Sequence, residues 1–276
     1  TALEQKEAAS VGALIAFHNP TASSRGTSAN CTGFIVGPNT VATSSHCIPD
    51  DLKTAGSNCS DRIWILYAKN SRFPRETMVC DRVITAAKTF SNADQTYTPD
   101  YALLQMRDMT KRPILKFSRL GLLQKQKTVV LKVTEIGTKA NTASFAMSKL
   151  EFTAKQRTSI LPTFTRGDHP IALFSNCPVE IGASGSPVLD DNGDVRAIIM
   201  AQVLTANGTP FSSQFALATN ATCIPPTNES ENFVVGSKCE VKTKLNTDAA
   251  DGTATGDVET LSNQAALAME QALNAR

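Results

Sequence analysis

Three residue types in this sequence could together perform nucleophilic chemistry: a serine in a glycine-rich turn, a histidine and an aspartate. Ser184 lies within Gly-Ala-Ser-Gly-Ser-Pro at residues 182–187. His46 is one of three histidines in the chain, and Asp100 directly precedes the run Tyr-Ala-Leu-Leu. A serine hydroxyl becomes a nucleophile when an imidazole takes its proton, and a carboxylate can hold that imidazole in place. The three residues therefore predict covalent catalysis by a serine.

The order of these residues along the chain restricts the arrangement. No histidine follows Ser184, which excludes the order Ser, Asp, His of the α/β-hydrolases for this serine. No aspartate precedes His46, so it cannot serve in the order Asp, His, Ser, and nothing around His169 resembles that arrangement. The order His46, Asp100, Ser184 remains, as in chymotrypsin. Asp94 competes with Asp100, but it lies in a polar stretch typical of a solvated loop, so Asp100 is favoured.

The segments around the three residues resemble those of the trypsin-like (chymotrypsin-family) serine proteases. Residues 31–47 run without a gap from a cysteine that begins a strand to Ser-Ser-His-Cys, where the family has Ala-Ala-His-Cys. Residues 100–104, Asp-Tyr-Ala-Leu-Leu, resemble the family's Asp-(apolar)-Ala-Leu-Leu strand. Residues 182–187 resemble Gly-Asp-Ser-Gly-Gly-Pro. The resemblance covers about residues 10–220, and little matches outside the three motifs.

This resemblance implies a role for each residue. His46 is expected to be the general base, Asp100 to orient it and Ser184 to attack the scissile carbonyl. The backbone N–H groups of Gly182 and Ser184 are expected to form the oxyanion hole. The implied function is that of a secreted serine endopeptidase. It is expected to act on a protein or peptide substrate through an acyl-enzyme, without a cofactor or metal. The alternatives are a catalytically silent binding or adhesion protein on the same fold, and an esterase.

Two departures from the family pattern are informative. Ala183 stands where animal digestive proteases carry an aspartate that pairs with a newly freed N-terminal amine. No Ile-Val-Gly-Gly start is present, so activation by that ion pair is not expected. Ser186 replaces the second glycine, as in the Gly-Asn-Ser-Gly-Ser-Pro of bacterial glutamyl endopeptidases, which points to a microbial branch.

The resemblance also places the substrate pocket. Its base is expected around Pro178 and Val179, where no aspartate supports a preference for Lys or Arg, and Glu180 is favoured as a surface residue. Met200, Ala201 and Gln202 are expected to form another wall, along which the substrate adds as an antiparallel strand. An apolar lining predicts cleavage after a hydrophobic or small side chain.

The seven cysteines are spread singly along the chain, which is typical of disulfides in an oxidising compartment. By the resemblance, Cys31 pairs with Cys47, and a loop of this size contributes about 3 kcal/mol in the chain-entropy model. The local pairings for the others are Cys59–Cys80 and Cys223–Cys239, with Cys177 free. Cys177–Cys223, with Cys239 free, is a serious alternative. A secreted protein, extracellular or periplasmic, is therefore expected.

The fold class is predicted to be all-β. Many short β-branched runs bounded by turn residues indicate a sandwich or barrels, and the resemblance implies two antiparallel six-stranded β-barrels. The acidic run at residues 190–194 contains Asn-Gly and lacks the alternating ligands of a calcium loop, so a hairpin turn is favoured over a calcium site. The runs that we expect to be strands are Val11–Phe17, Gly33–Val36, Arg62–Ala68, Tyr101–Met106, Thr128–Val133, Ile171–Ser175, Val195–Leu204 and Phe215–Thr219.

The expected organisation is an N-terminal barrel over residues 10–115, a C-terminal barrel over 116–245, and a linker with a helix over 246–276. Apolar residues fall on one face of that helix from Asp257 onward, which favours a helix docked on the body over one that binds a partner. The net charge of +2 does not suggest nucleic acid or an anionic membrane as a partner. The oligomeric state stays open. Residues 4–7 are polar where a signal peptide is apolar, so any leader is expected to be missing from this sequence.

Overall fold

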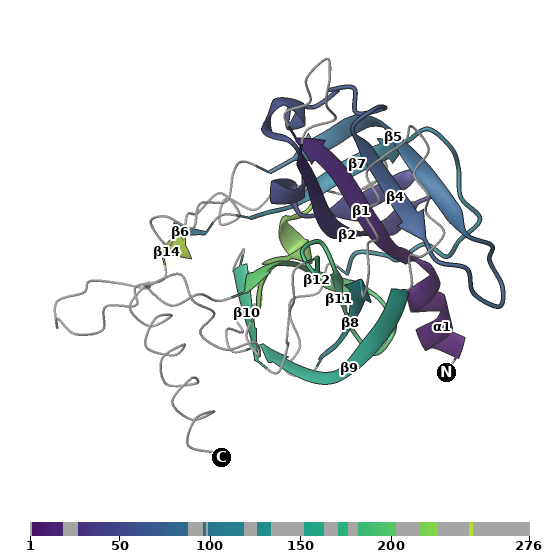
Figure 1. Cartoon of the computed structure of the whole chain (residues 1–276). Coiled ribbons are helices and arrows are strands. Elements are labelled where there is room, and N and C mark those ends of the chain that lie inside the picture. The colour runs from purple at the N-terminus through teal and green to yellow at the C-terminus, as the bar shows by residue number, and fades with distance from the viewer. Residues whose placement is uncertain are drawn as a thin grey trace, which may run out of the picture.

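A computed structural model of the chain consists mainly of β-strands, as the sequence predicts (Figure 1). Each of the eight runs expected to be strands overlaps a strand, and the one expected at Gly33–Val36 is longer, Thr27–Gly37. The expected C-terminal linker and helix, residues 246–276, lie outside the described residues. The structure describes residues 2–18, 27–87, 96–97, 99–118, 126–133, 152–162, 171–175, 182–202, 216–225 and 243–244.

Six strands of the N-terminal half form a closed antiparallel barrel in the order β1-β2-β3-β7-β5-β4. The barrel closes because β1 pairs with both β2 and β4. Its interior is apolar and includes Leu14, Ile65 and Leu104, each fully buried. The strands are β1 (Val11–His18), β2 (Thr27–Gly37), β3 (Thr40–Thr43), β4 (Ile63–Tyr67), β5 (Glu76–Ala86) and β7 (Ala102–Met106), preceded by helix α1 (Ala2–Ala9).

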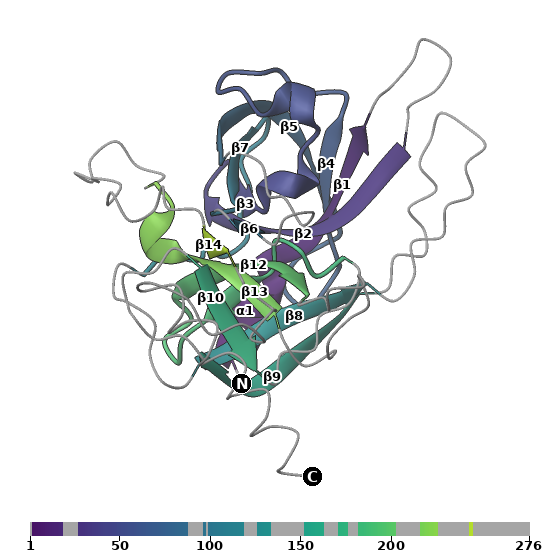
Figure 2. The ribbon, with the colours of Figure 1, turned by 90° about the vertical axis from the view of Figure 1, so that its left-hand side faces the viewer.

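A second antiparallel sheet follows in the chain and lies below the barrel in Figure 2. Its order is β10-β13-β12-β11-β8-β9, and β9 also pairs with β10. Two short strands, β6 (Thr96–Tyr97) and β14 (Thr243–Lys244), form a separate pair. The strands of the second sheet are β8 (Gln126–Val133), β9 (Phe152–Pro162), β10 (Ile171–Ser175), β11 (Pro187–Leu189), β12 (Val195–Gln202) and β13 (Ala216–Asn220).

An apolar cluster joins the barrel to the second sheet. Phe34 and Leu103 of the barrel pack in it with Leu189 and Ile198 of the second sheet, and none is more than 1% exposed. Burial of a side chain of this size stabilises a fold by about 1.5–3 kcal/mol. The junction is therefore a packed core of its own, and residues placed along it are held from both sides.

The turn between β11 and β12 is the hairpin that Asn192-Gly193 predicts. Gly193 has φ +80°, the left-handed conformation that such a turn requires. Asp190 is 3% exposed, and its Oδ1 accepts hydrogen bonds from the N–H groups of Asn192 and Asp194. Its Oδ2 accepts from Nε of Arg196 at 2.8 Å. The acidic run thus closes the hairpin between β11 and β12, which favours the prediction of a turn over a calcium site.

We expect Asp190→Asn to destabilise the fold by about 3 kcal/mol or more, because it removes the buried carboxylate that is paired with the Arg196 guanidinium. Urea denaturation followed by circular dichroism measures the change. Asp191→Asn, at the exposed neighbouring aspartate, is the matched control and should change stability by less than about 0.5 kcal/mol. Equal effects of the two substitutions would show that the buried ion pair contributes nothing particular.

Candidate active site

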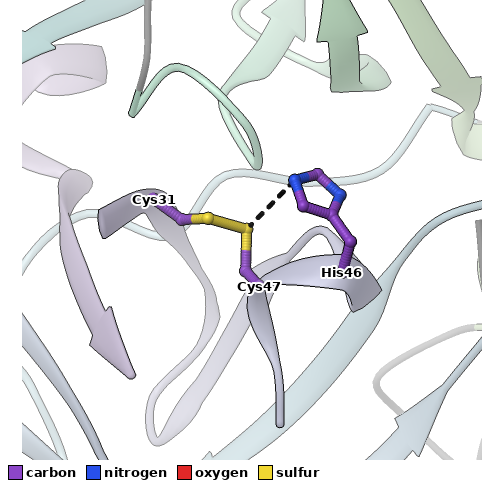
Figure 3. Close-up of side chains that lie close together, drawn as sticks. All are labelled: Cys31, His46 and Cys47. Atoms are coloured by element: carbon purple, nitrogen blue, oxygen red, sulfur yellow. Dashed lines mark hydrogen bonds between the residues drawn. A yellow bond between two sulfur atoms is a disulfide. The ribbon is translucent and has the colours of Figure 1, made fainter. Parts of the chain in front are cut away.

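His46 lies in a one-turn 3-10 helix, η1 (Ser45–Cys47), directly after strand β3. A disulfide joins Cys47 to Cys31 of β2 with an S–S distance of 1.97 Å, as predicted. It fastens the turn to the neighbouring strand, and the half-buried imidazole lies beside it (Figure 3). The Nε2 atom of His46 is 3.8 Å from Sγ of Cys47. The predicted Cys59–Cys80 disulfide is also present, in the same barrel.

The side chains of Cys31, His46 and Cys47 place their possible ligand atoms within 4.8 Å of one another. Zinc and related ions bind cysteine as the thiolate. Both sulfur atoms here are joined in the disulfide, so they do not provide thiolates. The group is therefore a histidine beside a disulfide and not a metal centre.

Asp100 is fully buried and makes both of its carboxylate contacts to His46. Its Oδ1 accepts the backbone N–H of His46 at 2.9 Å, and its Oδ2 lies 2.6 Å from Nδ1 of the ring. An ionised carboxylate has no proton to donate, so the Nδ1 atom carries the proton and Nε2 keeps its lone pair in the neutral ring. The imidazole is thus held in the tautomer that can accept a proton at Nε2.

Thr219 of β13 fixes the backbone of Asp100 from the second sheet. Its Oγ1 accepts the N–H of Asp100 at 2.7 Å and lies 3.2 Å from the Asp100 carbonyl. Burial raises the pKa of the next residue, Tyr101. Sequence reasoning placed Thr219 in a strand but gave it no role. Threonine is common in strands, and the residues around Thr219 form no motif that would have identified it as part of the site.

The turn that carries Ser184 requires two glycines. Gly182 and Gly185 have φ +97° and +87°, where residues with a side chain are strained. A Cβ atom on Gly185 would also collide with the Thr32 carbonyl oxygen. Ser184 itself is half-buried, and its hydroxyl donates to the Met200 carbonyl at 3.1 Å. That carbonyl lies where the pairing of β12 with β13 shifts register, between Ile199 and Ala201.

Hydrogen bonds across the junction bring the serine turn next to the histidine turn. The backbone N–H of Thr32 donates to the Ser184 carbonyl at 2.7 Å, and Thr32 follows the disulfide-bonded Cys31. The hydroxyl of Ser44, two residues before His46, donates to the Ile199 carbonyl at 2.8 Å. The structure therefore places His46 and Asp100 in direct contact and bonds the serine turn to Thr32, next to the cysteine that is disulfide-bonded to the histidine turn.

Comparison with known proteins shows the family. The model of the trypsin-like peptidase domain matches residues 31–198, more than half of the chain. The chain belongs to the trypsin-like peptidases. It is accordingly a serine endopeptidase, a hydrolase of peptide bonds. No curated protein matches the chain significantly by sequence.

Several solved structures are similar to this trypsin-like peptidase. The active form of the Rv3671c protease from M. tuberculosis is 16% identical, with a TM-score of 0.47, and the match covers 79% of each chain. Its inactive form is also 16% identical, with a TM-score of 0.47, over 80% of this chain and 87% of that one. A Glu endopeptidase in complex with MPD is 18% identical, with a TM-score of 0.48, over 77% and 85%.

The remaining site predictions concern the pocket and the other cysteines. The side chain of Met200 is fully buried, and the structure describes only the backbone of Ala201 and Gln202, within β12. Cys223 is disulfide-bonded, but its partner lies outside the described part of the chain. The pairing of Cys223 therefore stays open between the two predicted alternatives. Also outside the described part are Cys177, Pro178, Val179, Glu180, Cys239 and the competitor Asp94.

We expect Asp100→Asn to move the ring proton of His46 from Nδ1 to Nε2. The amide oxygen must face the His46 N–H, which leaves the amide NH₂ facing Nδ1, and two donors cannot bond each other. Nitrogen-15 NMR of the peptidase measures the tautomer, with His18 as an internal reference that should not change. Retention of the Nδ1 proton in the variant would contradict this geometry.

Proposed function

We propose that this peptidase is a secreted endopeptidase in which Ser184 is the nucleophile, His46 the general base and Asp100 the residue that orients the base. The observation that carries the proposal is the 2.6 Å contact between His46 Nδ1 and the buried Asp100 carboxylate. It leaves Nε2 as the only ring nitrogen able to accept a proton. The serine turn is bonded across the same junction, so the base and the hydroxyl are held by one set of strands.

Acylation begins when the Ser184 hydroxyl turns from the Met200 carbonyl toward His46. The oxygen then attacks the carbonyl carbon of the substrate, and its proton passes to Nε2 of His46. As the C–N bond breaks, the imidazolium gives that proton to the leaving amine, and the acyl group stays on Ser184. A water molecule repeats the sequence, with its proton taken by His46 and returned to the Ser184 oxygen. Protons balance over the cycle, and no cofactor takes part.

The backbone N–H groups of Gly182 and Ser184 are proposed to bind the oxygen of the tetrahedral intermediate. The left-handed conformation of Gly182 lets the chain reverse so that both N–H groups can face one point. Each such donor contributes about 3 kcal/mol to transition-state stabilisation in related chemistry.

We further propose that the second sheet is closed into a second six-stranded barrel. The domains are then an N-terminal barrel over residues 10–115, a C-terminal barrel over 116–245, and a C-terminal segment over 246–276. Pairing of β10 with both β13 and β9 supports the closure. The site then lies where the two barrels meet.

Disulfide bonds support the proposal that the chain is secreted. The chain has the disulfides Cys31–Cys47 and Cys59–Cys80, and Cys223 is also disulfide-bonded. Disulfides persist in oxidising compartments such as the extracellular space and the periplasm. None of the helices described is long and apolar enough to cross a membrane.

A fluorophosphonate probe tests the nucleophile directly, because it phosphonylates an activated serine. We expect the wild-type chain to be labelled, and Ser184→Ala and His46→Ala to lose labelling by at least about 1,000-fold. Intact-protein mass spectrometry measures the adduct.

Ser186→Ala is the matched control for that experiment. Its hydroxyl lies two residues from the nucleophile, is fully buried and has no hydrogen-bond partner in the described part of the chain, so its loss should leave labelling intact. Labelling that persists in Ser184→Ala would refute the assignment. Parallel assays with casein and an ester substrate separate a peptidase from an esterase of the same fold.

The cleavage preference is proposed to be for a hydrophobic or small residue before the scissile bond. Pro178 and Val179 form the proposed base of the pocket, and Met200, Ala201 and Gln202 form the proposed strand along which the substrate pairs. None of these residues carries a negative charge. A peptide library read by mass spectrometry should show cleavage after such residues, and cleavage only after Arg or Lys would overturn the proposal.

A further inference from the structure

The side chain of Thr32 connects the barrel to the turn that carries the nucleophile. Its hydroxyl donates to the Gly182 carbonyl at 2.7 Å, and its backbone N–H donates to the Ser184 carbonyl at the same distance. Its own carbonyl accepts the hydroxyl of Thr43 at 2.7 Å. Thr32 is fully buried, so water does not compete for these bonds.

These bonds fix the orientation of the peptide that supplies an oxyanion donor. The carbonyls of Gly182 and Ser184 both point at Thr32, which sets the two peptide planes that follow these residues. The plane between Ala183 and Ser184, which carries the Ser184 N–H, lies between them. Because peptide groups are planar, little rotation is left for it once both neighbours are held. The Ala183 carbonyl of that plane also accepts the Ser186 N–H at 3.0 Å, so the direction of the Ser184 N–H is set by the contacts from Thr32 together with this bond inside the turn.

The residue within the turn provides no charge for the same task. Ala183 is 3% exposed and apolar, whereas the resembled animal proteases hold this turn with an aspartate paired to an N-terminal amine. Ala183 cannot form such an ion pair, because its side chain carries no charge. The contact from outside the turn that fastens the Gly182 carbonyl is the Thr32 hydroxyl.

We propose that Thr32 is a positioning residue that holds the nucleophile turn in its catalytic conformation, in the role that the ion pair plays in animal digestive proteases. The proposal rests on the proposed function, because it assigns the turn an oxyanion hole. The backbone bond to Ser184 holds one end of the turn, and the hydroxyl bond to Gly182 holds the other. The Cys31–Cys47 disulfide beside Thr32 ties the same strand to the His46 turn. The peptidase then needs no newly freed amine to order its site.

The test compares Thr32→Val with Thr32→Ser, because valine keeps the shape without the hydroxyl and serine keeps the hydroxyl. Fluorophosphonate labelling is resolved into the binding constant KI and the rate constant kinact. We expect Thr32→Val to lower kinact by about 10- to 100-fold, less than the loss of a whole oxyanion donor, with KI within about twofold. Thr32→Ser should restore kinact to near the wild-type value.

Ser10→Ala is the matched control for removal of a buried hydroxyl. Ser10 is fully buried, and its hydroxyl lies 2.8 Å from the Pro113 carbonyl and 3.0 Å from the Lys6 carbonyl, neither of which belongs to the nucleophile turn. This variant should lose stability without a change in kinact. Equal kinact values in Thr32→Val and the wild type, or an equal loss in Ser10→Ala, would overturn the positioning role.

Amide hydrogen exchange gives a readout that does not depend on activity. In Thr32→Val, the amides of residues 182–186 should exchange at least about tenfold faster, while the amide of His46 should not change. Unchanged exchange in the turn refutes the proposal even if the protein proves inactive. Failure of the wild type to react with the probe, together with faster exchange in the variant, refutes the proposed function and leaves the positioning role standing.

If Thr32→Val does not fold, Thr32→Ala is compared with Thr32→Ser by the same exchange measurement, with the same two outcomes.

Discussion

A fully buried carboxylate must be hydrogen-bonded, and the requirement at Asp100 governs how the two sheets meet. Both of its oxygen atoms are satisfied by His46, so the turn carrying that histidine must fold against the mouth of β7. The backbone of Asp100 is satisfied by Thr219 from the other sheet. One buried charge thereby fixes the histidine, closes the barrel against its neighbour and sets the ring tautomer.

Hydroxyl groups carry much of the connection between the sheets. Thr32, Ser44 and Thr219 each make a buried hydrogen bond that crosses the junction, and each bonds to the backbone of its partner. Ser44 stands where the family motif has alanine, so its hydroxyl adds one more polar contact to this junction. A buried hydrogen bond contributes about 1 kcal/mol net, whereas a buried donor or acceptor left unpaired costs more. Such contacts therefore favour the one arrangement of the two sheets in which they are all formed.

The sequence predicted eight of the strands described and marked the three candidate site residues, because their signals are local. A gap-free motif marks His46, and a glycine-rich turn marks Ser184, whose flanking glycines have the left-handed φ angles that such a turn requires. Thr32 and Thr219 could not be predicted, because their partners lie 150 and 119 residues away along the chain. An isolated threonine in a strand is compatible with any partner or none. Strands β5 and β9 were also missed, since polar residues interrupt the apolar pattern of each.

The placement of the three residues along the chain has a consequence for synthesis. His46 and Asp100 belong to the barrel that emerges first from the ribosome, whereas Ser184 and Thr219 belong to strands made later. Domains generally fold in the order of synthesis, so the first barrel can form while the buried carboxylate still lacks its second-sheet contact. On the proposed assignment, a nascent chain holds a base without a nucleophile. On that assignment, the three residues come together only when the second sheet has closed against the first.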